Sequence, residues 1–232
     1  MGAAIRDPLS AVRLVVFDCD GTLIDGQHAI CAAMAEAFQS HRLGSPDPRD
    51  VRRVVGLPLV EAVRRLAPGG DARLCAALTL AYKESFHRLR QRPDYFEPLF
   101  PGAAEVLSQL GELGYRLGIA TGKSGKGLAA TLERHGLSRH FAVLKTSDDG
   151  PGKPSPHMLL YAMSDTGADP GTTVMIGDTV FDMEMARSAR VSAVGVAWGY
   201  HDSAELEAAG AAAVVNAFGE LPETVERLIG RT

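Results

Sequence analysis

Two aspartates spaced two residues apart are the first candidates for chemistry in this sequence. Asp18 and Asp20 follow the apolar run Leu14–Phe17, which is typical of a buried strand in a parallel sheet. Strand side chains alternate in direction, so both carboxylates start on one side, and Gly21 then lets the backbone turn away. Paired carboxylates repel each other unless a cation or a shared proton intervenes, and Mg²⁺ prefers oxygen ligands. The pair therefore predicts a magnesium site where open α/β sheets bind their ligands, with a turn of solvated acids as the alternative.

A second strand end carries residues suited to phosphate. The predicted strand Tyr115–Ala120 is followed by Thr121 and Gly122, and a helix is predicted to begin at Ser124. A hydroxyl group and the free N–H groups at a helix start together form an anion site. A Thr-Gly turn alone is weak evidence, so an ordinary turn is the alternative.

Lys153 and Asp178 supply two further candidates. Lys153 stands between Gly152 and Pro154 before a predicted helix, and a lysine fixed in this way can neutralise phosphate and carboxylate charge. An exposed loop lysine is the alternative. Asp178 follows another predicted strand and is suited to be a second metal carboxylate, with Asp182 as a supporting acid one helical turn later. A helix N-cap is the alternative for Asp178.

The elements that must position these residues alternate between strands and helices. The predicted strands are Val12–Phe17, Tyr115–Ala120, Phe141–Leu144, Thr172–Ile176, Val191–Ala197 and Val214–Val215. The predicted helices are Ala103–Leu113, Ser124–His135, Ser155–Thr166, Val180–Ala189 and Leu221–Ile229. This alternation predicts an α/β fold with a parallel sheet covered by helices on both faces.

A helical insert interrupts the alternation once, from residue 25 to residue 95. Ile30, Met34 and Phe38 repeat at every fourth position, which indicates an amphipathic helix. Three more helices are predicted there: one that Asp47 or Asp50 caps and that ends at Val55, one over Leu59–Leu66, and a long one through Leu74, Leu78, Tyr82 and Phe86. An insert of this size can pack as its own small bundle.

The charge balance gives no reason to expect a nucleic-acid partner. The 232 residues include 24 Lys and Arg and 28 Asp and Glu, so the net charge is 24 − 28 = −4, without a concentrated basic stripe. Arginines do cluster locally, and we interpret them mainly as solvated helix faces, with a cluster that faces an anionic substrate as the alternative. These are Arg52, Arg53, Arg64, Arg65, Arg88, Arg90 and Arg92.

Cysteine use and hydropathy predict a cytoplasmic protein that does not cross a membrane. Three cysteines make no disulfide framework, and Cys19 is expected to be a small buried filler. No apolar run has the length of a membrane span, and the N-terminus lacks a signal-peptide core. Residues Met1–Ala11 are expected to form a loosely held leader. The oligomeric state is left open.

Together and in this order, the motifs resemble those of the haloacid dehalogenase superfamily over nearly the whole chain. They are DCDGT from Asp18, the strand-end Thr121, GKPSP around Lys153 and GDTVFD through Asp178 and Asp182. The insert resembles the cap of the subgroup that contains phosphoglycolate phosphatases and β-phosphoglucomutases. The segments FDCDGTLID, ATGKS and KPSP are most similar to the phosphoglycolate-phosphatase-like branch. The resemblance implies a Rossmann-like core at residues 1–24 and 96–232 and an α-helical cap at 25–95.

The resemblance also implies a Mg²⁺-dependent phosphatase that acts on a small phosphorylated metabolite. Asp18 would attack the phosphomonoester and become an aspartyl-phosphate, while Asp20 would protonate the leaving alcohol and then activate water. The metal ligands would be Asp18, the backbone carbonyl of Asp20, and Asp178. The phosphate contacts would be Thr121, the amide of Gly122 and Lys153. The cap would select the leaving group near Gly56-Leu57-Pro58, with Arg52 and Arg53 as less certain candidates.

Other reactions in this superfamily fit the sequence less well. Asp20 argues against dehalogenation, which has no leaving alcohol to protonate. Phosphonate cleavage needs a cap lysine, and the insert's single lysine, Lys83, has the spacing of a solvated position. A phosphohexose mutase would carry a cap histidine near Ile30, whereas His28 is two residues away. A binding protein without turnover is the non-enzymatic alternative. Gly26 stands where close relatives often have serine, so the entrance to the cap is expected to differ.

Overall fold

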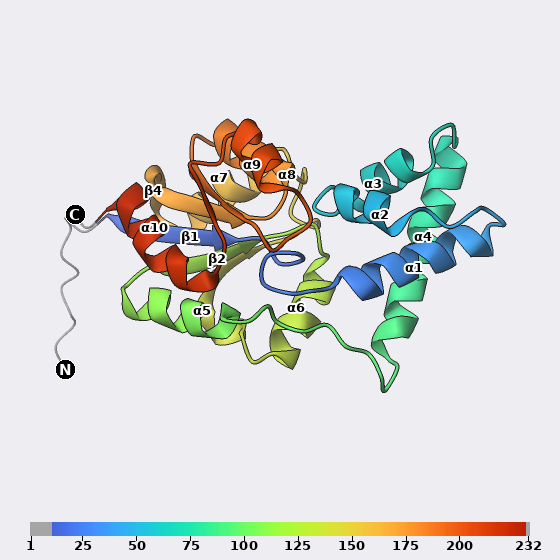
Figure 1. Cartoon of the computed structure of the whole chain (residues 1–232), viewed down its shortest axis with the longest axis horizontal. Coiled ribbons are helices and arrows are strands. Elements are labelled where there is room, and N and C mark those ends of the chain that lie inside the picture. Colours follow the sequence, from blue (N-terminus) through green and yellow to red (C-terminus); the bar gives the residue numbers. More distant parts are fainter. Residues whose placement is uncertain (1–10, 231–232) are drawn as a thin grey trace.

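A six-stranded sheet, in which each neighbouring pair is parallel, forms the centre of the computed structural model, which describes residues 11–230. The strands lie in the order β3-β2-β1-β4-β5-β6, so the chain reverses direction across the sheet between β1 and β4 (Figure 1). Their bounds are β1 Val12–Phe17, β2 Arg116–Ala120, β3 Phe141–Lys145, β4 Ala168–Gly177, β5 Ser192–Val196 and β6 Ala213–Val215. Ligands of open α/β sheets bind at such a reversal, outside the carboxyl ends of the strands.

Side chains of β1 alternate between two apolar layers. Val15 and Phe17 pack in one buried cluster, and Leu14 and Val16 pack in the other. The first layer is covered by α5 (Ala103–Glu112), α6 (Gly125–Arg134) and α10 (Leu221–Ile229). The second is covered by α7 (His157–Thr166), α8 (Val180–Ser188) and α9 (Ser203–Ala209). Burial on both faces is why the strand sequence is continuously apolar instead of alternating with polar residues.

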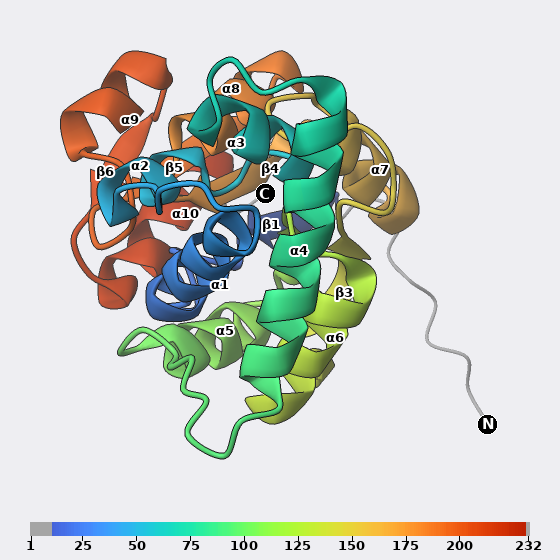
Figure 2. The ribbon, with the colours of Figure 1, turned by 90° about the vertical axis from the view of Figure 1, so that its right-hand side faces the viewer.

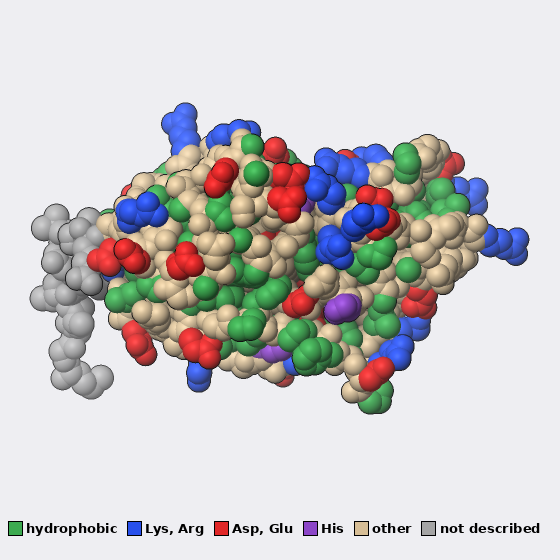
Figure 3. Space-filling view, in the orientation of Figure 1, with side chains coloured by type: hydrophobic (Ala, Val, Ile, Leu, Met, Phe, Trp, Pro, Cys, Tyr) green, Lys and Arg blue, Asp and Glu red, His purple; other side chains and the backbone are tan. Residues whose placement is uncertain are grey.

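Four consecutive helices form a separate group beside the carboxyl ends of the strands (Figures 1 and 2). They are α1 (Gln27–Ser40), α2 (Pro48–Val54), α3 (Leu59–Leu66) and α4 (Ala72–Arg90). Ile30, Met34 and Phe38 of α1 meet Leu78 of α4 in an apolar cluster of their own. Basic side chains gather over this group on the face shown in Figure 3.

The predicted elements are confirmed with small shifts at their ends. Asp47 caps α2, since its carboxylate accepts a hydrogen bond from the amide of Arg49 at 2.7 Å, whereas Asp50 lies in the first turn. Helix α9 was not predicted from the sequence. It begins with a capping box of Asp202 and Glu205. The leader predicted for Met1–Ala11 lies, apart from Ala11, outside the described residues.

None of the helices in the described part of the chain combines the length and the hydropathy that a bilayer crossing requires. Cys19 is fully buried, as expected, and is a free thiol.

A pair of leucines on α5 tests the packing of the first layer. Leu107 is fully buried and Leu113, at the end of the same helix, is 39% exposed. Leu107→Ala is expected to lower the free energy of unfolding by about 2–5 kcal/mol because it leaves a cavity. Leu113→Ala should lower it by about 0.5 kcal/mol or less. Urea denaturation measures both, and equal losses would contradict this packing.

Candidate active site

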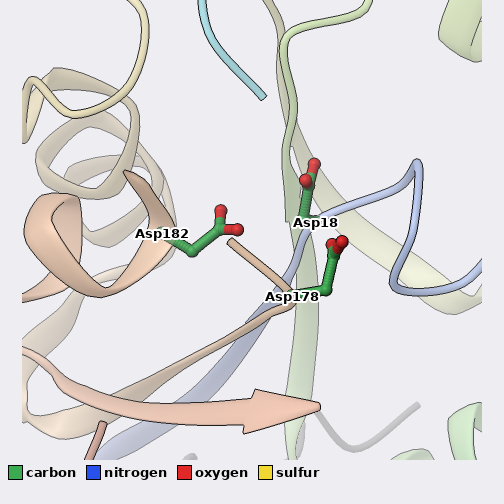
Figure 4. Close-up of side chains that lie close together, drawn as sticks. All are labelled: Asp18, Asp178 and Asp182. Atoms are coloured by element: carbon green, nitrogen blue, oxygen red, sulfur yellow. The ribbon is translucent and has the colours of Figure 1, made fainter. Parts of the chain in front are cut away.

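Two carboxylates meet where β1 and β4 end side by side. Asp18 follows β1 and Asp178 follows β4, and both side chains are buried. Figure 4 shows the two side chains extending in the same direction from the strand ends, with Asp182 approaching from the first turn of α8. The structure therefore brings together Asp18, Asp178 and Asp182, three of the residues singled out in the sequence.

Lys153 connects two of these acids. Its Nζ lies 2.8 Å from Oδ1 of Asp18 and 2.7 Å from Oδ1 of Asp182. The residue is 1% exposed, which rules out the alternative of an exposed loop lysine. Burial would lower the pKa of Lys153, but the two carboxylates raise it above its usual value, so the lysine stays charged.

Asp178 is held by neutral donors. The hydroxyl of Thr22 donates to its Oδ1 at 2.8 Å, and the amide of Tyr200 donates to its Oδ2 at 2.9 Å. The N-cap of α8 is Thr179, so the alternative of Asp178 as a helix cap is wrong. Gly21 has a φ of +85°, and a side chain there would collide with the Asp178 carboxylate, so glycine is required for this approach.

The three acids fit a divalent cation. One oxygen each of Asp18, Asp178 and Asp182 lies within 4.8 Å of the others. Burial and then the charges of Asp18 and Asp182 raise the pKa of Asp178 well above its usual value. Lys153 contributes one positive charge against three carboxyl groups, so full ionisation of all three would leave excess negative charge in a buried site. Oxygen donors with uncompensated charge suit Mg²⁺.

Asp20 lies apart from this group and has a different partner. Its Oδ1 pairs with Nζ of Lys123 at 2.8 Å. Burial raises the pKa of Asp20 above its usual value, although Lys123 acts in the opposite direction. A raised pKa favours the protonated carboxyl group that a general acid needs.

The predicted phosphate contacts Thr121 and Gly122 follow β2, next to β1 in the sheet, and Thr121 is buried. The helix that follows differs from expectation, because two of its first amides are already bonded. The amide of Gly125 donates to Asp148 and that of Gly127 donates to Ser124. The amides of Gly125 and Gly127 are therefore not free to bind an anion.

The loop Gly56–Pro58 of the helical group covers these strand ends. A Cβ at Gly122 would lie 3.4 Å from the carbonyl oxygens of Gly56 and Leu57, and one at Gly152 would lie 2.8 Å from the Pro58 ring. The predicted selector loop thus contacts both the Thr121 turn and the Lys153 loop. On the outer side, exposed Arg53 pairs with Glu205 of α9 at 2.5 Å.

Several residues that shape the site were not identified from the sequence. Arg90 was interpreted as solvated, but its side chain is only 16% exposed and lies 3.7 Å from Glu97. Glu97 gave no signal, because it lies in an aperiodic segment rich in proline and aromatic residues. Lys123 was visible beside the Thr-Gly turn without an assigned role, and the support of Asp178 by Thr22 and Tyr200 is a tertiary contact.

The model of one protein family covers most of the chain. Residues 15–196 match the haloacid dehalogenase-like hydrolases. The chain is 38% identical to the "Probable phosphatase IndB" of Dickeya dadantii, over 93% of this chain and 94% of that protein. It is 32% identical to the phosphoglycolate phosphatase of Chromobacterium violaceum, over 92% and 96%.

The fold agrees with that of a solved relative. A hydrolase from Pseudomonas syringae has a TM-score of 0.81 and 27% sequence identity, covering 94% of this chain and all (100%) of that one. The sheet and the helical group are both included in a match of this length.

Magnesium is expected to stabilise the folded chain, and more at pH 8 than at pH 5. Burial raises the pKa of Asp18 from 3.8 to about 6, and Lys153 only partly offsets this. A raised carboxyl pKa contributes stability that is full below pH 3.8 and is lost as pH rises through about 6. The metal-free protein should therefore melt at a lower temperature at pH 8. Mg²⁺ at about 100 times its Kd adds about 2.7 kcal/mol.

Thermal melts in EDTA and in Mg²⁺ measure this stabilisation. Asp178→Asn should remove most of the Mg²⁺ shift, whereas the exposed Asp165→Asn should keep it. A Mg²⁺ shift in Asp178→Asn as large as in the wild type would contradict the cation site.

Proposed function

The chain belongs to the haloacid dehalogenase-like hydrolase family and is a phosphatase; we propose that it hydrolyses a small phosphomonoester through an aspartyl-phosphate on Asp18. The observation that carries this proposal is the meeting of Asp18, Lys153 and Asp178 at the ends of β1 and β4, with Asp20 and Thr121 beside them. This set contains a nucleophile, a charge-neutralising lysine, metal carboxylates, a proton donor and a phosphate contact.

Asp18 is the proposed nucleophile. Lys153 occupies its Oδ1, which leaves Oδ2 to form a bond to phosphorus. As that bond forms, the bond from phosphorus to the ester oxygen breaks, and Asp20 transfers its proton to the departing alkoxide. The raised pKa of Asp20 supports this role.

Water then releases phosphate from the aspartyl group. Asp20, now a carboxylate, takes a proton from the water as its oxygen bonds to phosphorus, and the Asp18 carboxylate departs. Lys153 neutralises the returning negative charge. Thr121 and the amide of Gly122 are proposed to hold the phosphate oxygens throughout, because a loose phosphoryl transition state depends mainly on positioning.

A divalent cation is part of the proposal. Asp18, the backbone carbonyl of Asp20, and Asp178 would hold Mg²⁺, which would neutralise the phosphoryl oxygens, while Asp182 orients Lys153. The capping-box bonds of Asp182 to Thr179, at 2.7 Å and 3.1 Å, and its contact with Lys153 support this role.

Residues 25–95 are proposed to act as a cap that selects the leaving group. Contact of the loop Gly56–Pro58 with Gly122 and Gly152 supports this, since the loop limits the space above the strand ends. A small ester of the phosphoglycolate type is the proposed substrate, and a cytoplasmic location remains a prediction.

A phosphohexose mutase is less well supported. Ile30, where a mutase would have its histidine, is buried in the apolar cluster of the helical group. His28 is exposed and lines a surface hollow with Tyr95 and Phe96. Lys83, the one lysine of the insert, is exposed, which agrees with the argument against phosphonate cleavage.

Phosphate release from a panel of esters tests the proposed function. The panel contains 2-phosphoglycolate, hexose phosphates, nucleoside monophosphates, pyrophosphate and an aryl phosphate. We expect Mg²⁺-dependent release with the wild type and none above background with Asp18→Asn. Asp20→Asn should slow alkyl esters by about 10²–10⁴-fold, the usual contribution of a general acid.

Asp165→Asn, an exposed aspartate that pairs with Lys145, is the matched control and should keep wild-type rates. Release that persists in Asp18→Asn would exclude Asp18 as the nucleophile. Conversion of glucose phosphates without phosphate release would favour a mutase instead.

A further inference from the structure

A second group of buried charges lies beside the site, between the sheet and α4. Nζ of Lys123 lies 2.8 Å from Oδ1 of Asp20 and 3.2 Å from Oε1 of Glu97. Glu97 belongs to the segment between α4 and α5, and its side chain is fully buried. Arg90, in the last turn of α4, lies 3.7 Å from the other oxygen of Glu97. The mechanism above uses none of Glu97, Lys123 and Arg90.

Glu97 keeps its negative charge in this setting. Burial would raise its pKa, but Lys123 and Arg90 lower it below its usual value. Taking charges out of water is costly, and apolar side chains often replace a buried ion pair with no loss of stability. Stability of the fold alone therefore does not account for this pair.

The ion pair of Lys123 and Glu97 fixes the position of Oδ1 of Asp20. Oδ1 is buried under Lys123, and a Cβ at Gly26 would lie only 2.8 Å from it and 3.3 Å from Oε1 of Glu97. The Asp20 side chain is nevertheless 12% exposed. Its exposed part is thus away from Oδ1, which leaves Oδ2 as the oxygen available to a substrate. The missing Cβ of Gly26 permits this close packing.

Glu97 also joins Lys123 to the end of the helical group. Arg90 donates to the carbonyl of Gly127 at 3.1 Å and to the hydroxyl of Thr131, both in α6. The aromatic ring of Phe86, one turn earlier in α4, lies 5.7 Å from Nζ of Lys123. Lys123 is therefore enclosed by Glu97 and by the Phe86 ring, and its side chain is only 9% exposed.

We propose that Glu97 is a positioning residue for proton transfer: it holds Lys123 on Oδ1 of Asp20, so that Oδ2 presents the proton to the leaving oxygen. This inference rests on the role proposed above for Asp20 as the general acid. Glu97 itself touches no reacting atom, and its effect passes through Lys123.

The leaving group of the substrate separates positioning from a general structural effect. An alkyl ester needs a proton as its alkoxide departs, whereas an aryl phosphate such as p-nitrophenyl phosphate releases a stable phenolate. The quantity to compare is kcat/KM, because it ends at the departure of the leaving group and excludes hydrolysis of the aspartyl-phosphate. Glu97→Gln keeps the shape of the side chain and removes its charge.

We expect Glu97→Gln to lower kcat/KM for the best alkyl ester about 10- to 100-fold and for the aryl ester less than about 3-fold, as for a partly misplaced general acid. Lys123→Met should show the same selectivity, and the double variant should lose no more than the worse single variant, because both act through one contact. Glu205→Gln is the matched control, since it also removes a carboxylate that binds an arginine of the helical group, Arg53, without touching Asp20.

Each outcome bears on the inference. Equal losses for both esters, or no loss in either variant with a wild-type melting temperature, would overturn the positioning role while leaving the phosphatase proposal intact. Ester selectivity in Glu205→Gln would overturn it as well, because loosening of the helical group would then explain the effect. If Glu97→Gln does not fold, the ester selectivity of Lys123→Met decides. No release of phosphate by the wild type would remove the proposed function and this inference with it.

Discussion

Repulsion between buried carboxylates is the constraint on which the rest of this structure depends. Asp18, Asp178 and Asp182 lie together at the reversal point of the sheet, where little water can screen them. Lys153 pairs with two of them, and two neutral donors satisfy the third. When its carboxylates are ionised, the site has excess negative charge that a bound cation would neutralise. A bound cation would also favour the binding of a phosphorylated ligand.

The loops around the strand ends pack closely about this acidic site. Gly21 lets Asp178 approach β1, and the loops before α7 and after β2 are both in contact with the loop Gly56–Pro58. Two separate ion clusters result: Lys153 serves the proposed nucleophile, and Lys123 serves the proposed acid. Keeping them apart lets the two aspartates of one short motif have different surroundings and therefore different roles.

Much of this was predictable from the sequence, for identifiable reasons. The apolar strand Leu14–Phe17 and the polar ends of three strands follow from local patterns, and parallel strands bring their carboxyl ends to one edge. Helix α9 was missed because it is short, although Asp202 and Glu205 form a capping box. Glu97 and Arg90 were missed for a deeper reason. Their roles depend on packing between the helical group and the sheet, and no local sequence pattern predicts this packing. The roles of Asp18, Asp20, Thr121 and Lys153 remain proposals that this geometry supports.

The central claim is that Asp18 carries the phosphoryl group during turnover, and mass spectrometry of an acid-quenched reaction tests it most directly. Enzyme mixed with Mg²⁺ and its best ester is quenched within one turnover and digested, and the peptide that contains Asp18 is analysed. We predict that this peptide carries one phosphoryl group on Asp18 in the wild type and none in Asp18→Asn. Phosphate release by the wild type with no phosphorylated peptide at any quench time, together with turnover by Asp18→Asn, would contradict the account.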